Sequence, residues 1–311
     1  MSNLIEANDL RKRFKKTNAV DGLTLNVPEG SVTAFLGPNG AGKTTTIKCL
    51  LNLHQPTGGS ATVLGTDSTR LGPKEFSHIG YVSENMELPL WMSVQELLDY
   101  CRPMYDTWDR DFEAKMLKDF ELPKATKLKN LSRGQKMKAA LLSSLAYRPK
   151  LVVLDEPFSG LDPLVRDEFI RGLLELTEEE GWTVFVSSHD IEEVERLTDR
   201  VAIINRGRLQ LDESHEALQG RFRKVDVMLP EASAPSRSQP GAWIDVRADG
   251  RMVRFIHTRH ENGNVVDEVK QAYGPEAKVE VQSMTLREIF VALARTYRLQ
   301  GDATAKTEDG K

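Results

Sequence analysis

The sequence has little of several features that define whole classes of protein. Only two of its 311 residues are cysteines, Cys49 and Cys101, and they stand in no metal-binding or redox spacing. This excludes a disulfide framework and a cysteine-rich zinc site, and fits apolar fillers in a reducing cytosol. No apolar run approaches the roughly 18 residues of a membrane helix, and the first residues lack a signal-peptide pattern. We therefore expect a soluble chain that depends on a partner for any work at a membrane.

A surplus of positive charge is also missing. The chain has 42 Lys and Arg against 46 Asp and Glu, a net charge of −4, and a pI of about 6.0. Nucleic-acid binding usually requires a basic surface, so we expect no nucleic-acid partner. With 40% hydrophobic and 28% charged residues, the length suits one full domain and a smaller one.

A phosphate-binding loop is the strongest pattern that is present. The spacing G-x-x-x-x-G-K-[ST] begins at Gly37, and the loop with its flank comprises Gly37, Pro38, Asn39, Gly40, Ala41, Gly42, Lys43, Thr44 and Thr45. Its glycines let backbone N–H groups turn toward phosphates, Lys43 adds a positive charge, and the Thr44 hydroxyl can ligate Mg²⁺. Residues 31–36 read as a buried strand and residues 45–51 as a helix, a context that argues against a mere glycine-rich turn.

A second motif is an apolar strand that ends in two carboxylates. The run Leu151–Leu154 leads into Asp155 and Glu156. One carboxylate can hold a metal ion and the other can polarise a water molecule. Buried strands ending in acids are common, so this motif alone leaves function open. Together the two motifs predict binding and hydrolysis of a nucleoside triphosphate.

The order of predicted elements indicates an α/β fold with a mixed sheet and a parallel core. Short strands before residue 36 give way to alternating strands and helices, including a helix predicted at 191–198. We predict a first domain at 1–218 with a helical subdomain at about 85–147. A Ser-, Pro- and Ala-rich linker region follows at 219–241, then a small α+β domain at 242–299 and a disordered tail at 300–311.

Three more motifs complete a family pattern. Leu131–Gln135 lies between the two nucleotide motifs, and Ser159–Asp162 and Ser187–Asp190 follow them. With all five motifs in order, residues 3 to 218 resemble the ATP-binding subunit of an ABC transporter. The resemblance implies the fold of a P-loop ABC ATPase, with ATP as the nucleotide and Mg²⁺ as its metal.

The resemblance also implies roles for single residues. Glu156 resembles the general base, His189 the histidine that senses the γ-phosphate, and Lys43 the phosphate-binding lysine. Asp155 and Thr44 look like the residues that organise Mg²⁺. Phe14 is placed like the aromatic that stacks on adenine, although a half-buried strand residue is the alternative reading.

The segment Leu131–Gln135 implies a dimer. Ser132, Gly134 and Gln135 resemble the signature that meets the γ-phosphate of the opposite subunit, at the N-terminus of a predicted helix. Asp162 would lie near the seam. One signature and one phosphate loop per chain then imply a head-to-tail dimer, of identical or of different ATPase subunits.

Two residues depart from the family pattern. Glu84 stands where the family has a glutamine that ligates the metal, and a carboxylate can still ligate Mg²⁺ but adds negative charge. Arg133 replaces the first glycine of the signature and leaves Ser132 and Gly134 in place. The glutamate resembles a branch of ABC-2 type drug, antibiotic and lipid exporters, as does the closing segment at 283–293.

The family further implies a separate transmembrane permease subunit and work at the cytoplasmic face of the membrane. Residues 85–108 are the predicted docking segment, rich in large apolar side chains: Met86, Leu88, Leu90, Trp91, Met92 and Tyr105. Packing within the helical subdomain is the alternative for any one of them. In the exporter branch the C-terminal domain contacts its twin or regulates the cycle. The competing functions are a soluble ABC ATPase acting on ribosomes or nucleic acid, and a nucleotide-gated module with little turnover.

Overall fold

The computed structural model describes residues 2–231, 241–260 and 265–296. The chain divides into two compact units, Met1–Asp212 and Glu213–Lys311. The division lies a few residues before position 218, where the sequence predicts the first domain to end. The predicted tail at 300–311 and residues 232–240 of the predicted linker region lie outside the described residues, whereas residues 223–228 of that region form a strand.

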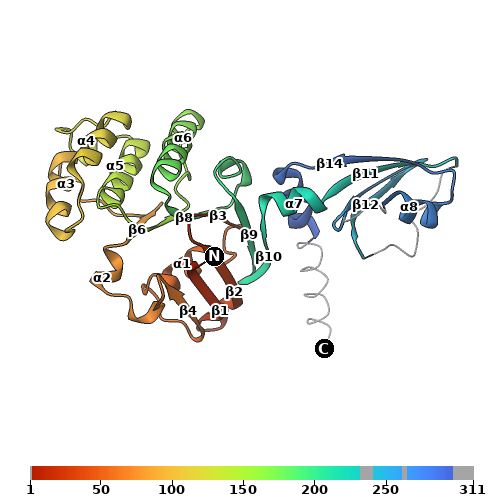
Figure 1. The fold of residues 1–311 in the computed structure, drawn as a ribbon, viewed down its shortest axis with the longest axis horizontal. Coiled ribbons are helices and arrows are strands. Elements are labelled where there is room, and N and C mark those ends of the chain that lie inside the picture. The colour runs from red at the N-terminus through yellow and green to blue at the C-terminus, as the bar shows by residue number, and fades with distance from the viewer. Residues whose placement is uncertain (1, 232–240, 261–264, 297–311) are drawn as a thin grey trace. The chain divides into compact units, whose positions relative to one another are not determined.

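A six-stranded sheet is the centre of the first unit (Figure 1). Its strand order is β10-β9-β3-β8-β7-β6, and the pairs β9/β3, β3/β8, β8/β7 and β7/β6 are parallel. The strands are β3 (Val32–Leu36), β6 (Ile79–Ser83), β7 (Leu151–Asp155), β8 (Thr183–Ser188), β9 (Arg200–Asn205) and β10 (Arg208–Ser214). Every residue of β3, β7 and β8 is buried, which explains why these strands are mostly apolar.

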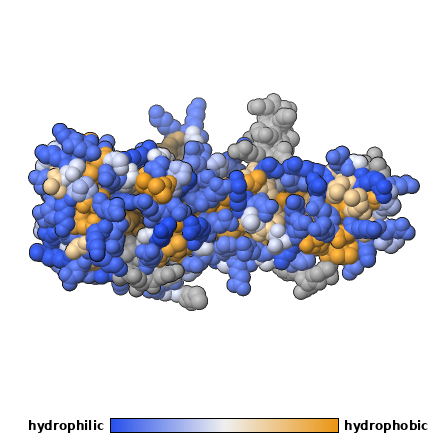
Figure 2. All heavy atoms as spheres, turned by 90° about the horizontal axis from the view of Figure 1, so that it is seen from above, coloured by the Kyte–Doolittle hydropathy of each residue, from blue (hydrophilic) through white to orange (hydrophobic). Residues whose placement is uncertain are grey.

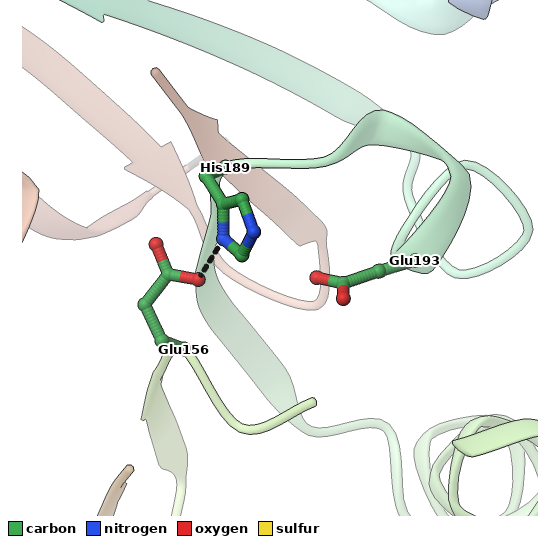
Figure 3. A group of neighbouring side chains, drawn as sticks. All are labelled: Glu156, His189 and Glu193. Carbon is green, nitrogen blue, oxygen red and sulfur yellow. Dashed lines mark hydrogen bonds and ion pairs between the residues drawn. The ribbon is translucent and has the colours of Figure 1, made fainter. Parts of the chain in front are cut away.

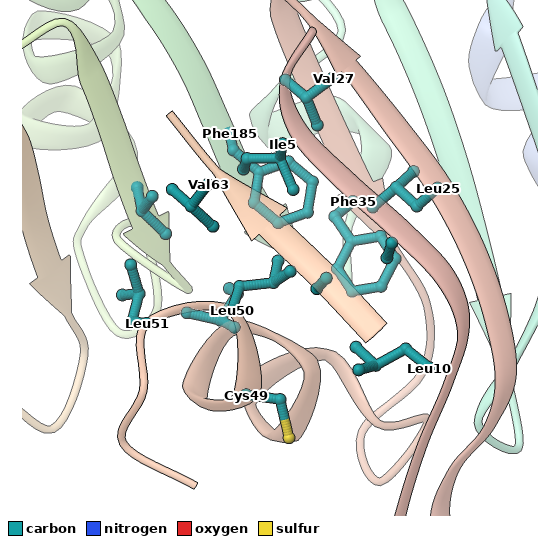
Figure 4. Close-up of a cluster of buried hydrophobic side chains, with 14 of the residues drawn as sticks. Ile5, Leu10, Leu25, Val27, Phe35, Cys49, Leu50, Leu51, Val63 and Phe185 are labelled. Atoms are coloured by element: carbon teal, nitrogen blue, oxygen red, sulfur yellow. The ribbon is translucent and has the colours of Figure 1, made fainter. Parts of the chain in front are cut away.

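A four-stranded sheet of order β2-β1-β4-β5 packs beside it in the same unit. The strands are β1 (Asn3–Phe14), β2 (Thr17–Pro28), β4 (Gly58–Val63) and β5 (Thr66–Asp67), and their pairs are antiparallel. Helix α1 (Lys43–Leu50) lies between the two sheets, and its apolar residues join theirs in one buried cluster (Figure 4). This core fixes the start of α1, where the phosphate loop ends.

Most helices of the first unit lie on the other side of the six-stranded sheet from α1 (Figure 1). They are α3 (Val94–Cys101), α4 (Arg110–Asp119), α5 (Arg133–Leu145) and α6 (Pro163–Glu180), with the short helices η2 (Arg102–Met104) and η3 (Leu128–Asn130). The short helices η1 (Ser68–Arg70) and α2 (Pro73–Phe76) lie on the same side as α1. Side-chain caps start the four long ones: Ser93, Asp109, Ser132 and Asp162 each accept a backbone N–H. The predicted mixed sheet with a parallel core and a helical layer is confirmed.

The prediction of a helix at residues 191–198 is wrong. The chain there forms one 3₁₀ turn, η4 (Ile191–Glu193), followed by further turns. The buried residues Ile191, Val194 and Leu197 recur every third position, which matches the three-residue period of 3₁₀ geometry better than the 3.6 of an α-helix.

The second unit is an antiparallel sheet with helices, as the predicted α+β class requires. Its strand order is β12-β13-β11-β14, and the elements are α7 (His215–Arg221), β11 (Arg223–Met228), β12 (Trp243–Asp249), β13 (Met252–His257), α8 (Val265–Tyr273) and β14 (Lys278–Ser283), with a helix at 286–296. Residues of the sheet and α8 form its core, in which Trp243 stacks on Phe255 with ring centroids 4.0 Å apart. Helix α7 and strand β10 have no counterpart among the predicted elements.

The surface is mostly polar on the face shown in Figure 2, where apolar side chains lie in small separate groups. Within the ranges that the structure describes, no helix combines the length and apolarity needed to cross a membrane. Large exposed apolar side chains therefore need an explanation of their own where they gather.

Candidate functional site

The phosphate loop joins β3 to α1, and two of its glycines are required by close contacts. A Cβ atom on Gly37 would lie 2.3 Å from the carbonyl oxygen of Ile204, and one on Gly42 would lie 2.3 Å from that of Ala19. Gly42 also has a φ of 113°, which L side chains rarely adopt. The loop therefore holds a shape that only glycine permits at these positions.

Lys43 lies at the centre of this loop and is almost fully buried. Its Nζ donates to the carbonyl oxygen of Gly37 at 2.6 Å and lies 3.0 Å from Oε1 of Glu156. The other carboxylate oxygen of Glu156 lies 2.8 Å from Nδ1 of His189 (Figure 3). Three predicted residues from three separate motifs thus meet in one chain of contacts.

Glu156 is held in an unusual backbone conformation. Its φ is 53°, in the left-handed region, where a non-glycine residue stores strain. Its N–H donates to the carbonyl oxygen of Ser187 at 3.2 Å and to the hydroxyl of that residue at 3.0 Å. Such strain is frequent at functional sites, because the surroundings must impose the position of the side chain.

Asp155 and Thr44 form the second part of the site. Oδ1 of Asp155 accepts from the Thr44 hydroxyl at 3.1 Å and from the Ser187 hydroxyl at 2.7 Å. Burial raises the pKa of Asp155, and these two hydrogen bonds partly oppose the effect. A carboxylate and a hydroxyl in contact are hard oxygen donors of the kind that Mg²⁺ prefers, so these residues fit the metal. A bound cation would also stabilise the charge that burial disfavours.

His189 stands between two carboxylates. Glu156 bonds its Nδ1, and Figure 3 shows the carboxylate of Glu193 facing the ring from the other side. The hydrogen bond with Glu156 raises the pKa of His189, and the charge of Glu193 adds to the effect. These three residues form a group whose ligand atoms lie within 4.8 Å of one another. Since Glu193 is also bonded by Ser188 and by Arg166, at 3.2 Å for the latter, we read it as a support for the histidine.

The side chain of Glu84 contacts residues other than Thr44 and Asp155. Its backbone N–H donates to the carbonyl oxygen of Asp155 at 2.9 Å, so it lies at the same edge of the sheet. Its Oε1, however, accepts from Arg133 and from the Ser159 hydroxyl, each at 2.8 Å. The predicted role of Glu84 as a metal ligand stays a prediction, and the two departures from the family pattern contact each other.

The predicted signature residues form a helix start. Ser132 caps α5 by accepting from the Gln135 N–H at 3.2 Å, and the Gln135 side chain accepts from the Ser132 N–H at 3.0 Å. This reciprocal capping box presents the two residues together at the first turn. Gly134 packs against Val165, since a Cβ there would lie 2.5 Å from Cγ1 of that residue. Asp162 caps the start of α6. Its Oδ1 accepts a hydrogen bond from the backbone N–H of Val165 at 3.1 Å.

The remaining predicted contact is Phe14, at the end of β1. Its side chain is 42% exposed, unusual for a large aromatic residue. It meets His54 edge to face, with ring centroids 5.5 Å apart, and Lys12 Nζ lies 4.9 Å from its ring. An open aromatic face is what stacking on a base requires.

The sequence analysis assigned no role to three residues that support the site: Ser159 and Ser187, which lie in the motifs named above, and Glu193. Ser187 bonds both Asp155 and the backbone of Glu156, Ser159 bonds Glu84, and Glu193 flanks His189. The adjacent pair Ser187-Ser188 directly before His189 was the available signal, since hydroxyls at the carboxyl end of a buried strand meet whatever lies at that edge.

Known proteins match this chain over the part that contains these motifs. A family model described as ABC transporter matches residues 20–159. An uncharacterized ABC transporter ATP-binding protein of Bacillus subtilis, YhcH, is 35% identical over 214 residues, which cover 67% of this chain and 69% of that protein. The bacitracin transport ATP-binding protein BcrA of Bacillus licheniformis is 34% identical over 226 residues, or 72% of this chain and 74% of that one. The sulfate/thiosulfate import protein CysA of Xanthomonas campestris is 37% identical over 218 residues, covering 67% and 63%.

Solved structures give the same result for the fold. The ATP-binding subunit of an ABC transporter matches 70% of this chain and 92% of its own at 26% identity, with a TM-score of 0.63. CbiO1 from Clostridium perfringens, part of the transporter complex cbiONQ, matches 70% and 90% at 28% identity and a TM-score of 0.61. The dimeric cassette MJ0796 matches 68% and 98% at 25% identity and a TM-score of 0.61.

Proposed function

The chain belongs to the ATP-binding subunits of ABC transporters, a family whose members hydrolyse ATP, and we propose that this one powers export through a separate membrane subunit. The observation that carries the ATPase part is the contact of Lys43, Glu156 and His189 beside Thr44 and Asp155. Every group that phosphate binding and water activation need is present in that cluster.

We infer the following use of this cluster. The phosphates of ATP lie against the loop N–H groups and bind Lys43 in place of Glu156. Glu156 is then free to accept a proton from the attacking water. His189, held by Glu156, donates toward the γ-phosphate. Thr44 and Asp155 would hold Mg²⁺, which neutralises phosphate charge when bound. Phe14 stacks on the adenine.

Direction of transport is inferred from two supports. BcrA serves bacitracin transport, and YbhF of Escherichia coli, 35% identical over 66% of this chain, is named a probable multidrug protein. Glu84 and the closing helix resemble the ABC-2 type exporter branch. The import protein CysA is similar as well, and the vesicle assay below distinguishes the two directions.

We propose that two ATPase subunits close head to tail over two ATP molecules, as the dimeric relative MJ0796 suggests. The face that would meet the partner carries Ser132 and Gln135 at the start of α5. Leu164, two residues after Asp162, is 71% exposed, and a protein interface would cover it.

The membrane partner is proposed to bind at residues 85–108. Four large apolar residues of this segment are exposed by about half or more: Leu90 at 49%, Trp91 at 66%, Tyr100 at 56% and Met104 at 57%. Two other residues of the predicted docking set pack inside the unit instead, since Met92 is 7% exposed and Tyr105 stacks on Tyr147 at 3.8 Å. The exposed four define the proposed partner surface, at the cytoplasmic face of the membrane.

A pull-down from detergent-solubilised native membranes tests the proposal. The bait is the tagged Glu156→Gln chain with ATP, which should remain closed on nucleotide, and captured proteins are identified by mass spectrometry. We expect a protein with several membrane spans. Ribosomal proteins or nucleic-acid factors alone would favour the soluble-ATPase alternative, and an empty pull-down would also contradict the transporter proposal.

A surface variant adds a matched control to the same assay. Trp91→Asp places a charge in the proposed partner surface and should abolish capture of the membrane protein. Leu53→Asp changes a residue 53% exposed outside that segment and should leave capture intact. In reconstituted vesicles whose ATPase subunits face outward, ATP added outside should drive export cargo into the lumen. ATP-dependent release of preloaded cargo under the same conditions would reverse the assigned direction.

A further inference from the structure

The two departures from the family pattern meet in one contact. Arg133 Nη2 lies 2.8 Å from Glu84 Oε1, although the two residues are far apart in sequence, at the start of α5 and just after β6. The Ser159 hydroxyl donates to the same carboxylate oxygen at 2.8 Å. An acidic residue and a basic residue that each replace an uncharged one are thus paired directly.

The backbone around the pair leaves space for the guanidinium. Gly160 has a φ of 67°, and a Cβ atom there would lie 2.4 Å from Arg133 Nη1 and 2.6 Å from its Cζ. Any side chain at position 160 would push Arg133 from this place. The guanidinium of Arg133 therefore packs against the backbone of Gly160 and pairs with the Glu84 carboxylate, which also accepts from Ser159.

The pair lies close to the residues of the ATP site. The Glu84 N–H is bonded to the carbonyl oxygen of Asp155, and Arg133 follows Ser132, the cap of α5. An unpaired carboxylate at this edge of the sheet would repel the phosphates of ATP, because like charges disfavour each other at short range. A neutralised carboxylate would not.

We propose that Arg133 is a positioning residue that binds Glu84 and neutralises its charge, so that the two charged residues together replace the uncharged pair of the family. Arg133 keeps the Glu84 carboxylate directed toward Ser159 and Gly160. This proposal rests on the ATP site proposed above. The effects of the two single substitutions on ATP binding should therefore not add up to the effect of the double substitution.

A double-mutant cycle on the full chain tests the pairing. The variants are Arg133→Gln, Glu84→Gln and the double variant, and the readout is the dissociation constant of ATP without Mg²⁺, by calorimetry. The Arg133→Gln chain should bind ATP about threefold to fivefold more weakly, the size expected for a partly exposed ion pair. The double variant should return to within about twofold of the wild type, as the repelling charge is gone.

Controls separate this effect from folding and from direct contact with nucleotide. Arg171→Gln removes an exposed arginine of α6 that is paired with Asp167 at 3.6 Å, and should leave ATP affinity unchanged. Melting curves of all variants exclude unfolding. The KM and kcat of the Mg²⁺-dependent reaction should split, with KM following the affinity and kcat changing less.

Two results would overturn the pairing. If the double variant binds ATP as weakly as Arg133→Gln, the arginine acts on nucleotide directly and not through Glu84. If Arg133→Gln binds as tightly as the wild type, the ion pair has no effect on the site. A wild-type chain that bound no ATP would instead refute the proposed function, and this proposal with it.

Discussion

Each unit contains a histidine bonded to a glutamate, and the two pairs differ in what surrounds them. In the first unit His189 Nδ1 lies 2.8 Å from Glu156, with the histidine side chain 41% exposed beside the phosphate loop. In the second unit His257 Nε2 lies 3.1 Å from Glu268, and the histidine is 2% exposed. The same two residue types therefore serve different ends.

In the second pair the histidine is buried, whereas the side chain of Glu268 is 34% exposed. Glu268 also accepts from Nε1 of Trp243 at 3.0 Å, and Trp243 stacks on Phe255. No substrate can reach a histidine that is enclosed in this way, so the network orders the core of the second unit. The open pair lies where the carboxyl ends of parallel strands meet, which is where ligands bind in such sheets. Location in the fold, and not the residue pair, separates the two roles.

The largest expected effect tests whether chemistry belongs to the open pair alone. Glu156→Gln keeps the size of the side chain but removes the proton acceptor, and should lower the steady-state ATPase rate by about 10²- to 10⁴-fold. The matched variant Glu268→Gln changes the second pair and should leave the rate within about twofold of the wild type. Phosphate release by the purified chain measures both, and equal losses would contradict the comparison.

The second prediction tests whether the units are stable independently. Phe255→Ala should destabilise the second unit by about 3–5 kcal/mol, because Phe255 is 2% exposed and its removal leaves a cavity. Phe185→Ala should do the same in the first unit, where Phe185 is fully buried. Scanning calorimetry should show that each variant lowers one transition and leaves the other in place. A joint shift of both transitions by either variant would mean that the units unfold as one.

How far the sequence predicted these units differs between them for a physical reason. The phosphate loop could be recognised because phosphate binding fixes the spacing of its glycines and Lys43 within one short segment. Close contacts with Ile204 and Ala19 require two of those glycines in the fold. Buried strands such as β3, β7 and β8 were readable because both of their faces are covered, so that most of their residues are apolar. The α+β class of the second unit was predicted from its alternating strands, but its function was not, since no local motif fixes its chemistry.

The contacts that support the site could not be read from sequence. Glu84, Arg133 and Ser159 are brought together only by the packing of α5 against the edge of the sheet, and sequence spacing holds no trace of it. The segment after His189 was predicted as one helix because its apolar spacing was ambiguous between two helix types. Long-range polar contacts and short irregular turns are thus the parts that required the structure.

A third prediction concerns the exposed aromatic residue of the first unit. Phe14→Ala removes the face on which adenine is proposed to stack, and base stacking on an aromatic ring contributes about 1–3 kcal/mol. The KM for ATP should rise by roughly fivefold to 100-fold, and Phe14→Trp should restore most of it. Met228 in the second unit provides the control, because it is 42% exposed, as Phe14 is. Met228→Ala should leave KM unchanged. If Phe14→Ala has a normal KM, Phe14 is only a strand residue.

The smallest expected effect is a difference of sign in the response to pH. The bond with Glu156 raises the pKa of His189, whereas burial, with Arg223 and His257 nearby, lowers the pKa of His260 in the second unit. The unfolded value for both is about 6.5. The stabilising contribution of His189 is fully present below that pH and is lost as pH rises through its higher folded pKa. That of His260 is present above about 6.5 and is lost as pH falls through its lower folded pKa.

Acidification should therefore favour the first unit at His189 and disfavour the second at His260. Calorimetric midpoints of the two transitions, measured between about pH 5 and pH 8, should change less with pH in His189→Gln for the first and in His260→Gln for the second. Each variant should leave the slope of the other transition as it is in the wild type, because each histidine belongs to a different unit. If both substitutions changed the pH slopes in the same direction, the two histidines would share one environment, and the contrast between an open and an enclosed site would fail.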